Sequence, residues 1–255
     1  MASVTIGIAG WGLPQPDLDL FPPPEFGSNL ARYAALFDTV EINSSFYRPH
    51  RPETYARWAE SVPEHFRFAV KLPKSITHEK RLHETGAELD RFAAEAGTLG
   101  GKLGWVLVQT PPSLRFDPDA VRALFAALRD RLNDAVTLAC EARHGTWFAS
   151  EATELMREMK VVRVVADPPA GEPGPFQPTH ENETYVRLHG SPLIYRSVYE
   201  TNRLAQVAEW LRGQQGRALV IFDNTMSGTQ VRQAAQLRQM LTSSLSSDHR
   251  QDSHT

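Results

Sequence analysis

Several features that would assign this chain to a known class are absent. The 255 residues contain one cysteine, Cys140, so no disulfide can form within the chain. No stretch reaches about 18 consecutive apolar residues, and the first residues lack the basic and apolar segments of a signal peptide. We therefore expect a cytoplasmic protein with no membrane contact.

A large excess of charge of one sign is also absent. The 27 Lys and Arg residues and the 30 Asp and Glu residues give a formal net charge of −3. This balance gives no support to nucleic acid as a partner, although a locally basic cleft remains compatible with it.

Two short motifs fail as well. The first predicted strand and the residues after it contain Gly7, Gly10 and Gly12. These glycines do not have the spacing of a dinucleotide-binding loop. Leu82 stands where a zinc-protease helix beginning at His78 would need its second histidine. Neither a nicotinamide cofactor nor a zinc-protease site is therefore indicated.

The chain does contain short β-branched runs that alternate with longer amphipathic runs, which is the pattern of βα units. Eight runs read as strands, at residues 4–11, 39–46, 67–73, 105–110, 136–143, 161–167, 184–189 and 218–224. Helical spacing is found at residues 29–37, 52–62, in a segment ending near 100, and at 118–132, 151–160, 202–213 and 229–241. Residues 168–182 form a loop rich in Pro and Gly.

Alternating βα units imply a parallel sheet, and eight of them in 255 residues favour closure into a barrel. We predict an α/β fold, a single-domain TIM (β/α)8 barrel that occupies residues 1–241. Residues 242–255 are polar and lack apolar periodicity, so we predict a disordered tail there.

Polar side chains stand at the carboxyl ends of nearly all the predicted strands. They are Glu41, Asn43, Lys71, Gln109, Glu141, Arg143, Arg163, Asp167, Arg187, His189, Asp223 and Asn224. In a barrel these ends surround one mouth, where active sites lie. The set is either a mutually paired salt-bridge network or a binding site, and the two can coexist.

Several segments together resemble the YecE-like family, domain-of-unknown-function family 72. They are IGIAGW at 6–11, TVEINSSFY at 39–47, RFAVKLP at 67–73, ITHEKRL at 76–82, QTPPS at 109–113, EARH at 141–144 with Trp147, RLHG at 187–190 and DNT at 223–225. The resemblance covers residues 4–241 in the family's order and implies a TIM barrel. It implies no activity, because the family is functionally unassigned.

The mouth offers candidates for acid–base chemistry. Glu41 or Glu141 could be the base and His144 or His189 the acid. Asp223 is a further catalytic candidate. The alternative is that each glutamate only pairs with an arginine of the rim.

A divalent metal is a weaker possibility. The carboxylates and histidines of the rim could supply ligands, but no compact ligand motif is present and the neighbouring basic residues would repel a cation. We therefore assign no metal and no cofactor.

An anionic ligand is favoured instead. Lys71, Arg143 and Arg187 form a candidate charge clamp, since guanidinium groups bind phosphate or carboxylate in a bidentate manner. Ser227 and Gly228 precede the last predicted helix, whose amino end would attract an anion; taken alone they are better explained by plain helix capping, and only together with the basic residues do they favour an anion site. We expect a wet mouth in which the arginines and carboxylates alternate.

Other residues could contact the substrate directly. Asn43, Gln109 and Asn224 would supply polar contacts. An aromatic wall could form from Trp11, Phe46, Tyr47 and Trp147, with loop packing as the alternative.

The leading functional hypothesis is an enzyme that uses acid–base chemistry on a small anionic substrate, phosphorylated or sugar-like. One alternative is a metal-assisted phosphodiester hydrolase acting on nucleic acid, which rests on analogy of fold alone. A second is a non-catalytic barrel that binds a small molecule or a protein. The sequence leaves the oligomeric state open.

Overall fold

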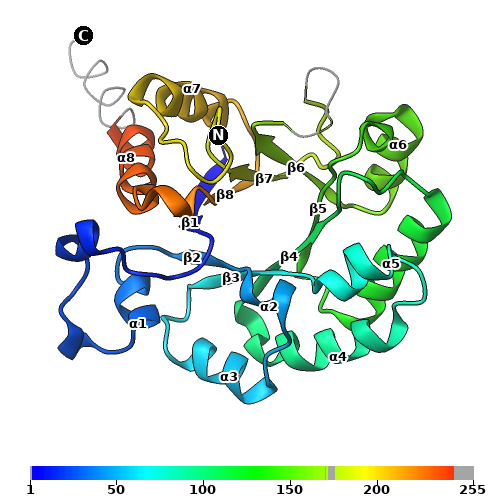
Figure 1. The fold of residues 1–255 in the computed structure, drawn as a ribbon, viewed down its shortest axis with the longest axis horizontal. Helices are drawn as coiled ribbons and strands as arrows, with labels where there is room; N and C mark the ends of the chain where they lie inside the picture. The colour runs from blue at the N-terminus through cyan, green and yellow to red at the C-terminus, as the bar shows by residue number, and fades with distance from the viewer. Residues whose placement is uncertain (1, 170, 172–175, 244–255) are drawn as a thin grey trace, which may run out of the picture.

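The computed structural model describes residues 2–169, 171 and 176–243. Its centre is a single sheet of eight strands in the order β1-β8-β7-β6-β5-β4-β3-β2, and the paired neighbours are parallel (Figure 1). The strands are β1 (Ser3–Ile8), β2 (Thr39–Ile42), β3 (Arg67–Lys71), β4 (Leu103–Gln109), β5 (Thr137–Glu141), β6 (Val162–Asp167), β7 (Glu183–Leu188) and β8 (Arg217–Phe222). The predicted TIM barrel is confirmed.

Most helices form an outer layer around the sheet (Figure 1). They are α1 (Asn29–Ala34), α2 (Ser44–Tyr47), α3 (Pro52–Glu60), α4 (Gly86–Ala96), α5 (Pro118–Arg131), α6 (Ser150–Glu158), α7 (Thr201–Arg212) and α8 (Gln230–Ser243). Proline at the first helical position begins α3 and α5, and the Asp117 carboxylate accepts two backbone N–H groups at the start of α5.

The edges of the sheet meet between β1 and β2. Ala9 forms an isolated bridge with Glu41, and the Gly10 N–H donates to the Glu41 carbonyl at 2.8 Å. Further down this seam the Tyr33 hydroxyl accepts from the Ile8 N–H at 3.0 Å and donates to the Thr39 carbonyl at 2.9 Å. A side chain thus supplies hydrogen bonds where the two strands have no continuous ladder.

Gly7 shows how close this seam is. A Cβ atom at Gly7 would lie 2.4 Å from the Thr39 carbonyl oxygen, nearer than any side chain could tolerate. Glycine at this position therefore lets β1 and β2 approach each other.

The alternation of strand side chains creates two apolar cores. Inside the barrel lie Ala69, Trp105, Leu107, Ala139, Val162, Val164, Tyr185, Leu219 and Ile221. The larger core lies between the outer face of the sheet and the helices. Residues that share the inward parity and stand at the carboxyl ends of the strands must therefore emerge at the mouth.

Two predicted features differ from the structure. The second strand ends at Ile42, because the following residues turn into α2. Between β6 and β7 the described residues contain no helix, which agrees with the loop predicted there. The last helix runs through Thr242 and Ser243, which were assigned to the tail, and the rest of that predicted tail lies outside the described residues.

Among the described residues, no helix combines the length and apolar character needed to cross a membrane.

Candidate active site

Arg187 is the centre of a buried ionic cluster at the carboxyl ends of the strands. From β7 its Nε and Nη2 donate to the two oxygens of Glu41 on β2, at 2.9 and 2.6 Å. Nη2 also donates to Asp223 at 2.9 Å, and Nη1 donates to Glu141 at the end of β5. Burial lowers the pKa of Arg187, but the three carboxylates more than reverse this and leave it well above its usual value.

This arrangement corrects one expectation. Arg187 was predicted to clamp an anion in a wet mouth, yet its side chain is fully buried. Glu41 and Glu141 are equally enclosed, and Glu41 also accepts from the Tyr185 hydroxyl. These residues therefore match the alternative of a mutually paired salt-bridge network, because the Arg187 guanidinium already donates its hydrogen bonds to carboxylates of the protein.

His189 links two carboxylates of the same cluster. Its Nδ1 lies 3.0 Å from Asp223 Oδ2 and its Nε2 lies 3.0 Å from Glu141 Oε1. Burial lowers the pKa of His189, but the hydrogen bonds to the two carboxylates raise it above its usual value overall. A carboxylate at each nitrogen therefore favours the protonated form of the imidazole.

The pKa values of the two carboxylates shift downward, opposite to that of His189. Burial raises the pKa of Glu141, but Arg187 and then His189 hold it well below its usual range. The pKa of Asp223 is lowered by the same two partners against the effect of burial. Both groups therefore stay ionised at neutral pH.

Lys71, at the end of β3, is a cation of the cluster that has no hydrogen-bond acceptor among the described residues. Among the described residues its Nζ makes no hydrogen bond or ion pair; it lies 4.1 Å from the centre of the Phe46 ring. The residue is only 8% exposed. Burial, and then the charge of Arg187, lower its pKa to about 8.

Arg143 and His78 form the outer layer of the site. Arg143 donates through Nε and Nη2 to one oxygen of Glu141, at 3.0 and 2.9 Å, and its side chain is partly exposed. The His78 ring meets the Phe46 ring edge to face at 4.9 Å. Burial lowers the pKa of His78, and the charges of Lys71 and then Arg143 lower it further.

Gln109 adds an unpaired donor at the end of β4. It is almost fully buried and its Nε2 has no hydrogen-bond partner. It shares the inward parity of Trp105 and Leu107, and it stands beside Glu141 in the strand register. A buried amide donor without an acceptor is costly unless a ligand or water supplies one.

Some predicted site residues serve the packing instead. Trp147 is fully buried, donates from Nε1 to the Leu114 carbonyl at 2.8 Å and packs on Phe116, so it is not part of a mouth wall. His144 caps the turn at Gly145–Phe148 by accepting the Thr146 N–H.

Polar residues after β8 fix the neighbouring loop. Asn224 Nδ2 donates to the Ser197 carbonyl and to Gln233 Oε1. Gly228 has a φ of +68°, which accounts for glycine in this turn. Ser227 ends the short turn Thr225–Ser227, and its side chain lies outside the described part.

The residues after β1 and β2 lie around a separate hollow. Trp11 and Asn43 line it, and the Trp11 ring packs edge to face on Trp58 of α3 at 4.9 Å. The exposed Tyr47 ring meets Phe46 edge to face at 5.1 Å. Of the predicted wall, Phe46 and Tyr47 therefore lie nearest to Lys71.

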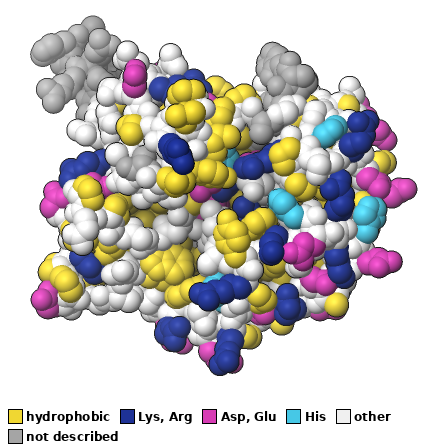
Figure 2. All heavy atoms as spheres, in the orientation of Figure 1, with side chains coloured by type: hydrophobic (Ala, Val, Ile, Leu, Met, Phe, Trp, Pro, Cys, Tyr) yellow, Lys and Arg dark blue, Asp and Glu magenta, His cyan; other side chains and the backbone are white. Residues whose placement is uncertain are grey.

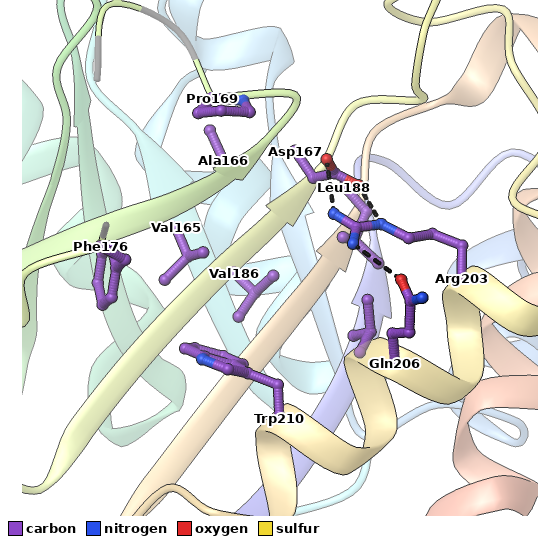
Figure 3. A pocket seen from close by; sticks show the side chains of 11 residues that line it. Val165, Ala166, Asp167, Pro169, Phe176, Val186, Leu188, Arg203, Gln206 and Trp210 are labelled. Carbon is purple, nitrogen blue, oxygen red and sulfur yellow. Dashed lines mark hydrogen bonds and ion pairs between the residues drawn. The ribbon is translucent and has the colours of Figure 1, made fainter. Parts of the chain in front are cut away.

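Strand β6 presents its polar residues to the outside of the barrel. Arg163 donates to the Trp147 carbonyl and to Thr153 of α6. Asp167 pairs with Arg203 of α7 at 3.1 Å, at one end of a pocket of about 310 Å³ lined by Val165, Val186 and Trp210 (Figure 3). The expectation that this strand also contributes to the mouth is wrong.

No group of three or more His, Cys, Asp or Glu side chains in the described ranges is arranged to hold a metal ion. The carboxylates at the mouth face Arg187 and His189, and the surrounding cations would repel a metal.

Gln109 was predicted as a polar contact of the site, whereas His78 and Tyr185 were not among the predicted site residues. Tyr185 could have been found, because it stands two residues before Arg187 on the same strand face. His78 lies in the irregular helical turn Ser75–Glu79, where no periodic pattern indicates which way a side chain points.

Taken together, these features define an α/β-barrel protein with a buried ionic cluster at the carboxyl ends of its strands. A family model described as "Protein of unknown function DUF72" matches residues 5–254. The chain belongs to this family.

Two relatives agree with this family assignment, and a solved structure shares the fold. The chain is 30% identical over 203 residues to the UPF0759 protein YunF of Bacillus subtilis, a match that covers 73% of this chain and 70% of YunF. It is 30% identical over 145 residues to the UPF0759 protein YecE of Escherichia coli, covering 55% of this chain and 52% of YecE. A crystal structure of a DUF72 family protein from Enterococcus faecalis superposes with a TM-score of 0.78 at 20% identity, covering 94% of this chain and 95% of the other.

Proposed function

We propose that the mouth binds a small anionic substrate and acts on it by acid–base chemistry. The observation that carries this proposal is the unpaired ammonium group of Lys71 beside the ionic cluster. A buried cation without a partner is unfavourable, and an anion that enters the mouth would supply the missing partner.

The charge balance of the cluster supports an anion over a cation. Four cationic groups, Lys71, Arg143, Arg187 and His189, face the three carboxylates Glu41, Glu141 and Asp223. With His189 protonated, one positive charge is left over. The free Nε2 of Gln109 could donate to an oxygen of the same ligand.

The roles of the residues follow from their accessibility. Lys71 and the exposed edge of Arg143 would hold the anion. His78 keeps a neutral imidazole at neutral pH, because its pKa is lowered by burial and by Lys71, so it can accept a proton. Short irregular helical turns such as the one that presents His78 are frequent at functional sites.

Glu41, Glu141 and His189 would then act as positioning residues. Their hydrogen bonds fix Arg187 and Arg143, and they have no free face toward the mouth. This assignment replaces the acid and base roles that the sequence favoured for them.

Anion binding can be tested by calorimetry with inorganic phosphate. We expect Lys71→Met to weaken phosphate binding at pH 7 by at least about tenfold, the cost of losing one charge-assisted contact. Lys74→Met is the matched control, because Lys74 is an exposed lysine three residues away that pairs with Glu79 on the surface. Equal affinity in the wild type and in Lys71→Met would disprove the anion site.

Acid–base chemistry can be tested without knowledge of the product. A panel of small phosphorylated sugars and 2-oxo acids is incubated with the protein in D2O, and exchange of carbon-bound hydrogen is followed by NMR. We expect exchange in at least one compound with the wild type and none with His78→Gln, which should still bind phosphate. Exchange that persists in His78→Gln would remove the role assigned to this histidine.

A further inference from the structure

The exposed hydrophobic side chains of this protein are unevenly distributed. Among the described residues six large hydrophobic side chains are exposed; Tyr47 ends the short helix α2 that follows β2, and the other five stand in segments between a strand and the next α-helix. Such segments lie at the carboxyl ends of the strands, which is the end of the mouth. They are Phe26, Tyr47, Leu193, Ile194, Val198 and Met226.

One part of this set borders Lys71. The Phe46 ring lies below the Lys71 ammonium group, and Tyr47 packs edge to face on that ring. Tyr47 itself is 73% exposed. An apolar surface therefore begins directly beside the unpaired cation.

The other part borders His189. The Tyr195 N–H donates to the His189 carbonyl, and the two rings meet edge to face at 5.9 Å. The Met226 N–H donates to the Tyr195 carbonyl at 3.1 Å, and the Leu193 carbonyl accepts the Ser197 N–H at 2.9 Å. These bonds hold Leu193, Ile194 and Met226 on the loops around His189.

Charged and His side chains lie close together near the middle of the face seen in Figure 2, with hydrophobic side chains on both sides of them. We call Tyr47, Leu193, Ile194, Val198 and Met226 the apolar rim. Exposed apolar side chains gathered around a binding site indicate that a ligand or partner covers them.

We propose that the substrate is an amphipathic anion, whose charged group contacts Lys71 and Arg143 while its apolar body covers the apolar rim. The inference rests on the proposed anion site and adds the chemical class of the rest of the molecule. Lys71 is nearly buried and Arg143 is partly exposed, while the side chains of the apolar rim are exposed, so a ligand with one anionic end and one apolar end matches both. A small hydrophilic anion such as free phosphate would leave the apolar rim uncovered.

The test is a series of ligands that share one head group. Inorganic phosphate, methyl, butyl, hexyl and octyl phosphate are titrated by calorimetry below their micellar concentrations. A fully buried methylene strengthens binding about fourfold. Because the rim covers only one side of a chain, we expect about a twofold gain for each methylene until the chain extends beyond the rim.

Two variants test whether the apolar rim causes the gain in affinity with chain length. The double variant Leu193→Ser/Met226→Ser should bind inorganic phosphate like the wild type but lose most of the gain with chain length. Phe26→Ser is the matched control, because Phe26 is equally exposed but lies outside the rim, and it should leave the gain unchanged. Both variants concern exposed side chains, so the fold is retained.

The outcomes separate this inference from the proposed function. If phosphate binds with dependence on Lys71 but chain length has no effect, the inference is wrong and the anion site stands. If no member of the series binds, both are wrong. Sedimentation with phosphatidylserine vesicles and analytical ultracentrifugation of the free protein complete the test. Vesicle binding or self-association that requires Leu193 and Met226, without a chain-length effect, would assign the rim to a membrane or a second copy and overturn the inference.

Discussion

Arg187 and Glu41 face each other across the inside of the barrel in a parallel, two-bond arrangement. Nε meets Oε2 at 2.9 Å and Nη2 meets Oε1 at 2.6 Å, with neither side chain exposed. The pair joins β7 to β2, which are not neighbours in the sheet. In this geometry one guanidinium group cross-links strands that share no backbone hydrogen bond.

Replacing Arg187 tests how much this cross-link stabilises the fold. Arg187→Met should lower the free energy of unfolding by about 3–5 kcal/mol, because the buried Glu41 would lose its cationic partner and keep only the Tyr185 hydroxyl, and Glu141 would lose one of its cationic partners. Arg187→Lys should lower it less, since a charge remains but cannot reach all three carboxylates. Urea denaturation at pH 7 measures both.

The control for this experiment is Arg217→Met. Arg217 pairs with Glu183 at the other end of the barrel and is largely exposed, so about 1 kcal/mol or less should be lost. A loss in Arg187→Met no larger than in this control would mean that the cluster does not stabilise the barrel.

Lys71→Met should change the pH dependence of stability. The pKa of Lys71 is lowered from 10.5 to about 8 by burial, so between these values the unfolded chain binds the proton more tightly. The stability of the wild type therefore gains from this group as the pH rises through that window. At pH 7 the variant should be more stable by up to about 3 kcal/mol, and the difference should shrink toward pH 10.

Denaturation curves of both proteins at intervals between pH 7 and pH 10 provide the measurement. A variant less stable than the wild type at pH 7 would show that Lys71 is stabilised by its neighbours and is not available for a ligand.

His189 should give the opposite pH dependence of stability. Its pKa is raised above 6.5 by Asp223 and Glu141 against the effect of burial. The stability that it contributes is fully present below pH 6.5 and is lost as the pH rises through the raised pKa. The difference between the wild type and His189→Gln should therefore be largest in mild acid and decrease in alkali.

For this prediction the matched variant is His65→Gln, because His65 pairs with Asp38 on the surface and both side chains are well exposed. It should change stability little at any pH. A flat difference between the wild type and His189→Gln across this range would contradict the protonated state assigned to His189.

Tyr33→Phe tests the seam between β1 and β2. Removing the hydroxyl leaves the Ile8 N–H and the Thr39 carbonyl buried without partners, which should cost about 1–3 kcal/mol. Amide exchange at Ile8 should also become faster. Tyr47→Phe, at an exposed ring, should have neither effect.

The period of two along each strand explains why much of the site could be predicted. Glu41, Lys71 and Glu141 each belong to the inward face of a strand, and in a barrel that face must lead to the mouth. The same rule failed for β6, where the face that carries the polar residues Arg163 and Asp167 points outward and the apolar Val162 and Val164 point into the barrel. Asp167 therefore lies on the outer face against α7.

Pairing and accessibility could not be predicted in this way. Which carboxylate meets which cation depends on the tilt and stagger of the strands, which the pattern of one strand does not contain. Trp147 follows a strand like other mouth residues, but its ring turns inward to pack on Phe116. Whether a loop side chain is buried depends on tertiary contacts, which leave no pattern in the neighbouring sequence.

The long span of the ionic cluster has a kinetic consequence. Glu41 and Arg187 are 146 residues apart in the chain, so their bonds can form only when the second and seventh strands have reached one another. Interactions completed after the rate-limiting step of folding slow unfolding without speeding folding. If the cluster forms after that step, it lengthens the time for which the assembled barrel stays folded.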